Sequence, residues 1–244
     1  MAVEAVLFDL DATLVDYDDA AYALTVQRVC LSLAALYPLL DVSRLAETHS
    51  GINRQIWQLP AGQIVQASSG AKDGHSIWRE VWQQTLEACG CHDSMAADRA
   101  VDLYERDRRA SYRLFDDVLE TLQGLHRRVA IAVVTNGPGE TQRDKLRATG
   151  IERYTDAIVA SGEVGVAKPN AAVFQVALNA LGVTPANAWH VGDSLALDVA
   201  GAHNAGLTSV WLNRTGAQRD ASHPQPHHEI ASLWELTGLL ESEA

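Results

Sequence analysis

From residue 116 onward the sequence alternates between helix-like patterns and short apolar runs typical of buried strands. The strand-like runs are VAIAVVT, DAIVAS, NAWHVGD and TSVWLN, and HEIAS is a candidate for one more edge strand. Between them lie the helix-like stretches DDVLETLQGLHRR, ETQRDKLRATG, NAAVFQVALNALG and LALDVAGAHNAG. Repeated strand–helix units build parallel sheets that are covered by helices. The pattern therefore predicts an α/β fold with a doubly wound parallel sheet.

Several of these helices carry sequence signals for their ends. Asp117, followed three residues later by Glu120, predicts a capping box at the start of the first helix. Asn170 is expected to cap the start of the third. Gly150 and Gly182 are expected to end the second and third helices, because glycine readily adopts a left-handed conformation.

The N-terminal run VEAVLF has the continuous apolar character of a strand buried on both faces, as in parallel sheets. After it, residues 16–111 give helical patterns and no convincing strand. In HSIWREVWQQTLEAC, for example, apolar residues recur at spacings of four, which is typical of an amphipathic helix. We therefore expect an α/β core formed by residues 1–15 and 115–244, with an all-helical domain, residues 16–114, inserted after the first strand.

Two side-chain types are expected to be structural. Trp57, Trp78 and Trp82 fall on helical faces and are expected to pack in the core of the insertion. His190 lies inside a predicted strand and is expected to be a hydrogen-bonded core residue.

Composition excludes several classes of partner. The formal charge is −12 and no long basic run is present, which argues against nucleic acid. No run approaches the ~20 apolar residues that span a bilayer, and Asp9 and Asp11 interrupt the N-terminal apolar run, so we expect neither a membrane segment nor a signal peptide. Three cysteines are too few for a disulfide framework. We expect a cytoplasmic protein, monomeric or homodimeric, that acts on a small molecule.

Polar residues follow the predicted strands where each strand ends. Asp9 and Asp11 follow the first strand, two residues apart, so both can face the same side. Thr135 ends the strand VAIAVVT, and Asp193 ends NAWHVGD. The loop GEVGVAKPN after DAIVAS carries Lys168. Because the carboxyl ends of parallel strands share one edge of a sheet, where α/β proteins bind ligands, we expect these residues to converge there.

Such a group would combine a cation site with an anion site. Carboxylates from Asp9 and Asp193 suit Mg²⁺, which usually takes one or two protein carboxylates together with phosphate oxygens and water. Thr135 and Lys168 can donate to phosphoryl oxygens. The residues alone therefore predict magnesium-assisted phosphate chemistry.

The segments DLDATLVD, TNG, KPN and GDSLALDVAGAHNAG resemble, in order, the four motifs of the haloacid dehalogenase superfamily. The helical insertion resembles the helical C1-type cap of that family. Within the family, TNGPGETQRDKLRATGI and SGEVGVAKPN are similar to the branch of nucleoside 5′-monophosphate and N-acylneuraminate 9-phosphate phosphatases. One departure is Ala12, where glycine is commonest; because the residue remains small, we do not expect it to abolish activity.

The resemblance implies a role for each residue. Asp9 would be the nucleophile that forms an aspartyl-phosphate, and Asp11 the general acid and then the base for water. The backbone carbonyl of Asp11 would also meet the metal. Asp198 would be a metal ligand through water, or would orient Lys168. The residues expected to bind metal are Asp9, Asp11, Asp193 and Asp198. The residues expected to bind substrate are Thr135, Asn136, Lys168 and Arg54.

The leading hypothesis is a Mg²⁺-dependent phosphatase acting on a sugar phosphate or nucleotide. The family's haloacid dehalogenases lack an acid at the position of Asp11, so its presence argues against that activity. The family's phosphonate hydrolases also lack an acid at this position, and they need a lysine in the cap. Lys72 is the only lysine in the insertion. A phosphosugar mutase would keep every motif. A non-catalytic phosphate-binding or scaffold protein is a further alternative. Specificity is expected to depend on the insertion, where Arg44, Arg54 and Arg79 are the first arginines to test.

Overall fold

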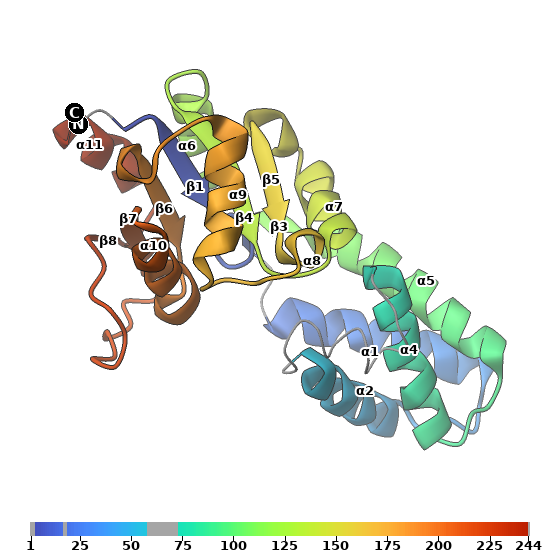
Figure 1. Cartoon of the computed structure of the whole chain (residues 1–244). Coiled ribbons are helices and arrows are strands. Elements are labelled where there is room, and N and C mark those ends of the chain that lie inside the picture. The colour runs from blue at the N-terminus through green and yellow to red at the C-terminus, as the bar shows by residue number, and fades with distance from the viewer. Residues whose placement is uncertain (1–2, 17–18, 58–72, 244) are drawn as a thin grey trace. The chain divides into compact units, whose positions relative to one another are not determined.

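The chain forms two compact units (Figure 1). In this computed structural model the described residues are 3–16, 19–57 and 73–243. The first unit comprises residues 1–16 and 113–244, and the second comprises residues 17–112. The second unit is thus inserted into the first soon after its first strand. Lys72 lies outside the described residues, as does the side chain of Trp57.

The first unit is built on a six-stranded sheet, whose strands are β1 (Ala5–Phe8), β4 (Ala130–Thr135), β5 (Ala157–Ala160), β6 (Ala188–Gly192), β7 (Thr208–Leu212) and β8 (His228–Ile230). Their order is β5-β4-β1-β6-β7-β8, and every neighbouring pair is parallel. The predicted doubly wound parallel sheet is confirmed, and so is the predicted edge strand at β8. The direction of winding reverses at β1, which makes the carboxyl end of β1 the place where such sheets bind ligands.

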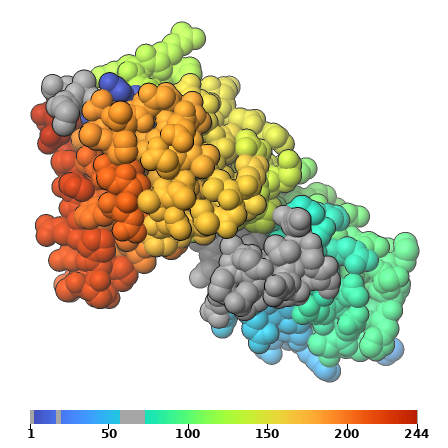
Figure 2. Space-filling view, in the orientation of Figure 1, coloured from blue at the N-terminus to red at the C-terminus, as the bar shows by residue number. Residues whose placement is uncertain are grey.

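The helices of this unit are α6 (Val118–Leu125), α7 (Gly139–Thr149), α8 (Ser161–Val164), α9 (Ala171–Leu181), α10 (Ala200–Ala205) and, after the last strand, α11 (Trp234–Ser242), with 3₁₀ turns at Glu152–Tyr154 and Pro185–Asn187. All four residues of β1 are fully buried. Ala5 and Leu7 pack with Phe174 of α9 in one hydrophobic cluster, while Val6 and Phe8 alternate to the opposite face. Figure 1 shows α9 lying across the sheet, and its residues form a continuous part of the visible surface of this unit in Figure 2.

Three of the expected helix ends are confirmed in detail. The Asn170 side chain accepts a hydrogen bond from the Ala172 amide at the start of α9. Gly150 and Gly182, at the ends of α7 and α9, have φ angles of 72° and 69°, a conformation that costs glycine little. The predicted helix over LALDVAGAHNAG begins differently, with a single π-helical turn at Leu195–Val199 before α10.

The predicted capping box at α6 is wrong. Helix α6 does begin after Asp117, but the Asp117 side chain makes no capping hydrogen bond. Its carboxylate is instead an ion-pair partner of Arg214, at 2.7 Å, and accepts hydrogen bonds from the Ser232 hydroxyl and the Leu233 amide. The pairing with Arg214, which is far away in the sequence, thus replaces the capping hydrogen bond at the start of α6.

The second unit consists of helices, namely α1 (Asp19–Leu36), α2 (Val42–Trp57), α4 (Gly74–Ala88) and α5 (Ser94–Ser111). Helix α1 packs on α2 and α5, and α4 packs on the same two helices. Trp78 and Trp82 are buried, as predicted. The two-residue strands β2 (Val15–Asp16) and β3 (Arg113–Leu114) pair antiparallel and belong to the first unit. No helix among the described residues is long and apolar enough to cross a membrane.

Candidate active site

Strand register brings the motif residues to one edge of the sheet. Phe8, the last residue of β1, pairs with Val133 of β4 on one side and Val191 of β6 on the other. Asp9 follows Phe8 directly, and Asp193 follows the end of β6. Thr135 ends β4 at the same edge. The parallel sheet, rather than proximity in the sequence, therefore collects these side chains.

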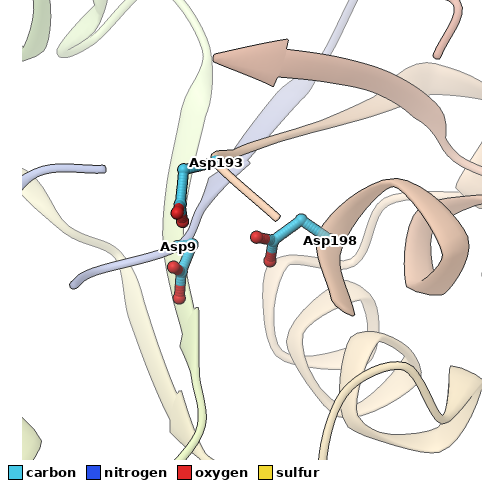
Figure 3. A group of neighbouring side chains, drawn as sticks. All are labelled: Asp9, Asp193 and Asp198. Carbon is cyan, nitrogen blue, oxygen red and sulfur yellow. The ribbon is translucent and has the colours of Figure 1, made fainter. Parts of the chain in front are cut away.

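Three carboxylates meet at this edge. Asp9, Asp193 and Asp198 each offer an oxygen, and these oxygens all lie within 4.8 Å of one another. Figure 3 shows the carboxylate of Asp198 pointing toward those of Asp9 and Asp193. Asp198 comes from the π-helical turn after β6. A side chain on Gly192 would collide with the Asp198 carboxyl group, so the missing side chain at position 192 is what lets Asp198 reach the group.

Lys168 lies between two of these carboxylates. Its Nζ donates to Asp9 Oδ1 at 2.5 Å and to Asp198 Oδ1 at 2.7 Å, and the residue is buried. His190 Nε2 lies 3.0 Å from the same oxygen of Asp198, so the expected hydrogen-bonded core histidine is confirmed and its partner is identified. Asp198 thus orients Lys168, which in turn contacts Asp9.

Burial and charge set the protonation of this cluster. Burial raises the pKa of Asp9 to about 7, an effect that Lys168 opposes and Asp198 reinforces. Burial would also raise the pKa of Asp198, but Lys168 and then the hydrogen bond from His190 hold it below its usual range. Burial and the charge of Asp198 raise the pKa of Asp193. The ionised forms of Asp9 and Asp193 are thus disfavoured by burial and by the charge of Asp198, and a bound cation would stabilise them.

Asn136 holds the backbone at Lys168. Its side-chain Oδ1 accepts from the Lys168 amide at 2.9 Å, and its Nδ2 donates to the Lys168 carbonyl at 3.3 Å. Gln142 donates in turn to the Asn136 carbonyl. Thr135 is buried at the end of β4, and its hydroxyl makes a long contact, 3.4 Å, with the Asn136 carbonyl.

Asp11 has a partner that sequence reasoning missed. Lys145 Nζ lies 2.6 Å from both carboxylate oxygens of Asp11, and Lys145 is buried although it is a lysine. It belongs to α7, where the buried residues are Thr141, Gln142, Lys145 and Leu146. Because that buried face is mostly polar, no apolar stripe in the sequence marked Lys145 as a buried lysine that needs a partner.

The turn after β1 is held by contacts from distant residues. Arg214 donates to the Thr13 carbonyl at 3.0 Å while pairing with Asp117. The Thr13 hydroxyl lies 3.5 Å from Asp193 Oδ1. Ala12, between Asp11 and Thr13, has a φ of 60°. That is the left-handed region, which explains in physical terms why a glycine suits this position.

Arg54 belongs to the helical unit, whereas the other expected site residues belong to the first unit. It is an exposed residue in the last turn of α2, in the helical unit. Its expected part in substrate binding stays a prediction. Arg44 and Arg79 already have partners, the Ala88 carbonyl and the Asp98 carboxylate respectively.

The donor set fits a hard divalent cation. The cluster offers only carboxylate oxygens, which are the protein ligands of Mg²⁺. Asp198 is already bound by Lys168 and His190, which leaves Asp9 and Asp193 as the direct donors. Two carboxylates are the usual protein contribution at a magnesium site that also binds phosphate.

Comparisons with known proteins agree with this arrangement. A model of the haloacid dehalogenase-like hydrolase family matches residues 3–206. The N-acylneuraminate-9-phosphatase of Mus musculus is 32% identical over 98% of this chain and 94% of its own length. A pyrimidine 5′-nucleotidase of Escherichia coli is 37% identical over 50% of this chain and 52% of its own. A 2-haloacid dehalogenase structure from Pseudomonas syringae superposes with a TM-score of 0.75 at 28% identity, covering 99% of this chain and 100% of that one.

Proposed function

Because the chain belongs to the haloacid dehalogenase-like hydrolase family, we propose that it is a Mg²⁺-dependent phosphatase acting on a small phosphate monoester. The observation that carries the proposal is the cluster of Asp9, Asp193 and Asp198 around the buried Lys168 at the carboxyl edge of the sheet. Negative groups that bind metal and a lysine that binds phosphoryl oxygens are both needed for phosphoryl transfer, and both are present.

Each residue has a defined task in this reaction. An oxygen of Asp9 attacks phosphorus, and the bond from phosphorus to the leaving oxygen breaks. Asp11 gives its proton to that oxygen, which leaves as an alcohol. Asp11 then takes a proton from water as the water attacks the aspartyl-phosphate, which releases inorganic phosphate and restores Asp9. Lys168 stabilises the charge on the phosphoryl oxygens throughout.

Asp9 and Asp193, with the backbone carbonyl of Asp11, would hold the magnesium ion. When bound, the ion would supply positive charge that offsets repulsion between the carboxylates and the incoming phosphate. Asp9 and Asp198 keep Lys168 charged, because burial alone would lower the pKa of Lys168 while these two carboxylates raise it above its usual value. His190 contacts Asp198 and helps to hold that carboxylate in place.

The substrate is proposed to be a sugar phosphate or a nucleotide. Two relatives of the chain, an N-acylneuraminate-9-phosphatase and a pyrimidine 5′-nucleotidase, support these two classes. The test is phosphate release across a panel of sugar phosphates, nucleotides and small carboxylated phosphates, with Mg²⁺ and with excess EDTA. Asp9→Asn serves as the inactive control, because an amide cannot act as the nucleophile. Undiminished release in EDTA, or by Asp9→Asn, would contradict the proposal.

A dehalogenase is the second candidate, favoured by the likeness to the Pseudomonas syringae structure. Attack of Asp9 on carbon would displace a halide without general acid help. Asp11 and its buried partner Lys145 would then have no task, so the phosphatase is preferred. Halide release from 2-chloropropionate, measured beside phosphate release from p-nitrophenyl phosphate, separates the two.

A further inference from the structure

One arginine in the helical unit is buried without an acid partner. Arg108, in the last turn of α5, is only 5% exposed. No ion pair or hydrogen bond joins its guanidinium to another residue in the described part of the chain. Its Nε is fully buried and has no hydrogen-bond partner there. Arginines are rarely buried unless they are paired, because an uncompensated charge is costly to desolvate.

Aromatic rings surround this guanidinium. Its Cζ lies 3.6 Å from the centroid of the Trp78 ring, 5.8 Å from that of Tyr104 and 5.6 Å from that of Tyr112. All three aromatic residues are buried. Stacking occupies the face of the guanidinium, whereas its N–H donors lie in the plane and point outward from the edge. The rings therefore hold the group flat without satisfying its donors.

The nearest acids in the sequence are engaged elsewhere. Glu105 pairs with His75 at 3.1 Å, and Asp107 pairs with Arg106 at 2.8 Å. On α4, Arg79 pairs with Asp98 at 2.6 Å. Arg108 thus differs from Arg79 and Arg106, whose charges are neutralised by carboxylates. The partial negative charge at the end of α5 compensates only part of its charge.

We propose that Arg108 and the rings of Trp78, Tyr104 and Tyr112 form an anion-binding site within the helical unit. The ligand is a small oxyanion, a carboxylate or a phosphate, bound by two parallel hydrogen bonds from the planar edge of the guanidinium. This geometry is the usual one for arginine with such anions. The anion comes either from a separate small molecule or from a carboxylate of the substrate; only the second source rests on the proposed function.

The first experiment measures anion-dependent stability of the full-length protein. Acetate is titrated at constant ionic strength and fixed Mg²⁺ while the melting temperature is followed. A ligand that binds the folded state raises the melting temperature, so the wild type is expected to respond. Arg108→Met, which keeps length and removes charge, is expected to lose the response without being less stable in the absence of acetate. Arg79→Met, the matched control on α4, should respond like the wild type.

The opposite pattern overturns the proposal. If Arg108→Met is destabilised without acetate and still responds to it, Arg108 is a structural cation packed on Trp78. If the methionine variant does not fold, Arg108→Lys replaces it, because lysine keeps the charge but lacks the planar pair of donors. An acetate response in Arg108→Lys equal to that of the wild type would then count against an anion site.

The second experiment identifies the source of the anion. Kinetics are compared for p-nitrophenyl phosphate and for 3-phosphoglycerate, which carries a carboxylate. If the anion belongs to the substrate, Arg108→Met should raise KM for the carboxylated ester by about 10- to 100-fold and leave p-nitrophenyl phosphate unchanged. If the anion is a separate molecule, neither KM changes while the acetate response is lost. Equal loss on both esters, with the acetate response retained, contradicts the site. Wild-type protein that hydrolyses neither these two esters nor any member of the panel above refutes the phosphatase and leaves the acetate test intact.

Discussion

At the scale of single residues, Asp9 and Asp11 differ in what contacts them. Asp9 contacts Lys168 and lies in the carboxylate cluster, whereas Asp11 contacts Lys145. Two acids of the same type, two positions apart, are thereby given different electrostatic surroundings. In the proposed reaction Asp9 would attack phosphorus while Asp11 would handle protons, and two such roles call for different surroundings.

Asp11→Asn is expected to slow esters with poor leaving groups most. A sugar or nucleoside alkoxide needs a proton as it leaves, and general acid help is worth about 10²–10⁴-fold. A nitrophenolate leaves without that help, but the attacking water then lacks its base. Rapid mixing should show a burst of nitrophenol, followed by a hydroxylamine-labile acyl phosphate on Asp9. Equal slowing of both ester types with no trapped phosphoenzyme would remove Asp11 from its proposed role.

Ala12→Gly is expected to stabilise the protein. Ala12 has a φ of 60°, which costs a residue with a β-carbon roughly 1–2 kcal/mol, and the greater flexibility of unfolded glycine offsets part of the gain. A net increase of about 1 kcal/mol in the free energy of unfolding is expected from denaturant titration. Ala180→Gly, on the exposed side of α9 where the backbone is helical, should instead destabilise. Destabilisation by both changes would show that Ala12 is unstrained.

At the scale of elements, the Asp117–Arg214 pair joins the start of α6, the turn after β1 and the segment before α11. Arg214→Met would leave the buried Asp117 without its cation. It is expected to lower the free energy of unfolding by about 3–5 kcal/mol. The double variant Asp117→Asn/Arg214→Met has no charge at either position. Its loss of unfolding free energy should therefore be smaller than the sum of the losses in the two single variants. Denaturant unfolding of the four proteins measures this, and strict additivity would mean that the two residues do not interact.

The helical unit contains a histidine that should make it sensitive to acid. His49 is buried, stacked on Trp82 with ring centroids 4.0 Å apart, and its Nε2 has no partner among the described residues. Burial lowers its pKa from 6.5 to about 3. The unfolded chain therefore binds a proton at higher pH than the folded chain does. Below about pH 6.5 this difference reduces stability by roughly 1.4 kcal/mol per pH unit.

His49→Phe removes the titrating group and should flatten the dependence of unfolding free energy on pH between about 6.5 and 5, whatever it does to stability at neutral pH. Most carboxylates titrate below this window, whereas Asp9, whose pKa is raised to about 7, adds a slope of opposite sign that is common to the wild type and His49→Phe. Burial also lowers the pKa of His190 in the first unit. His190 therefore adds to the dependence of unfolding free energy on pH in both proteins, and a residual slope is expected to remain in His49→Phe. An unchanged slope in His49→Phe would mean that His49 is already protonated or exposed.

At the scale of the whole molecule, the formal charge is −12, and the fold gathers three carboxylates around one lysine. Mg²⁺ is therefore expected to raise the melting temperature, and excess EDTA to lower it, because a ligand of the folded state stabilises that state. Asp193→Asn should lose both this response and turnover. Asp220→Asn makes the same change in net charge on an exposed loop and should keep both. Loss of the response in Asp220→Asn as well would point to non-specific screening.

The sequence by itself determined the class of fold and the edge at which the motif residues meet. Strand-like and helix-like periodicities are local properties, and parallel strands have only one carboxyl edge, so residue order alone assigns Asp9, Lys168 and Asp193 to that edge. The glycine and asparagine signals at Gly150, Gly182 and Asn170 are equally local. They succeeded because nothing distant competes with them.

Only the tertiary structure decided which partner each charge takes. The Asp117 side chain pairs with Arg214 and does not cap α6, and Lys145 of α7 pairs with Asp11. Arg108 stacks on Trp78 and contacts no carboxylate among the described residues. Burial and the approach of residues far apart in the sequence set these pairings, and neither is encoded in spacing. Charge pairing depends on distance and on exclusion of water, so it is fixed only when the chain has packed.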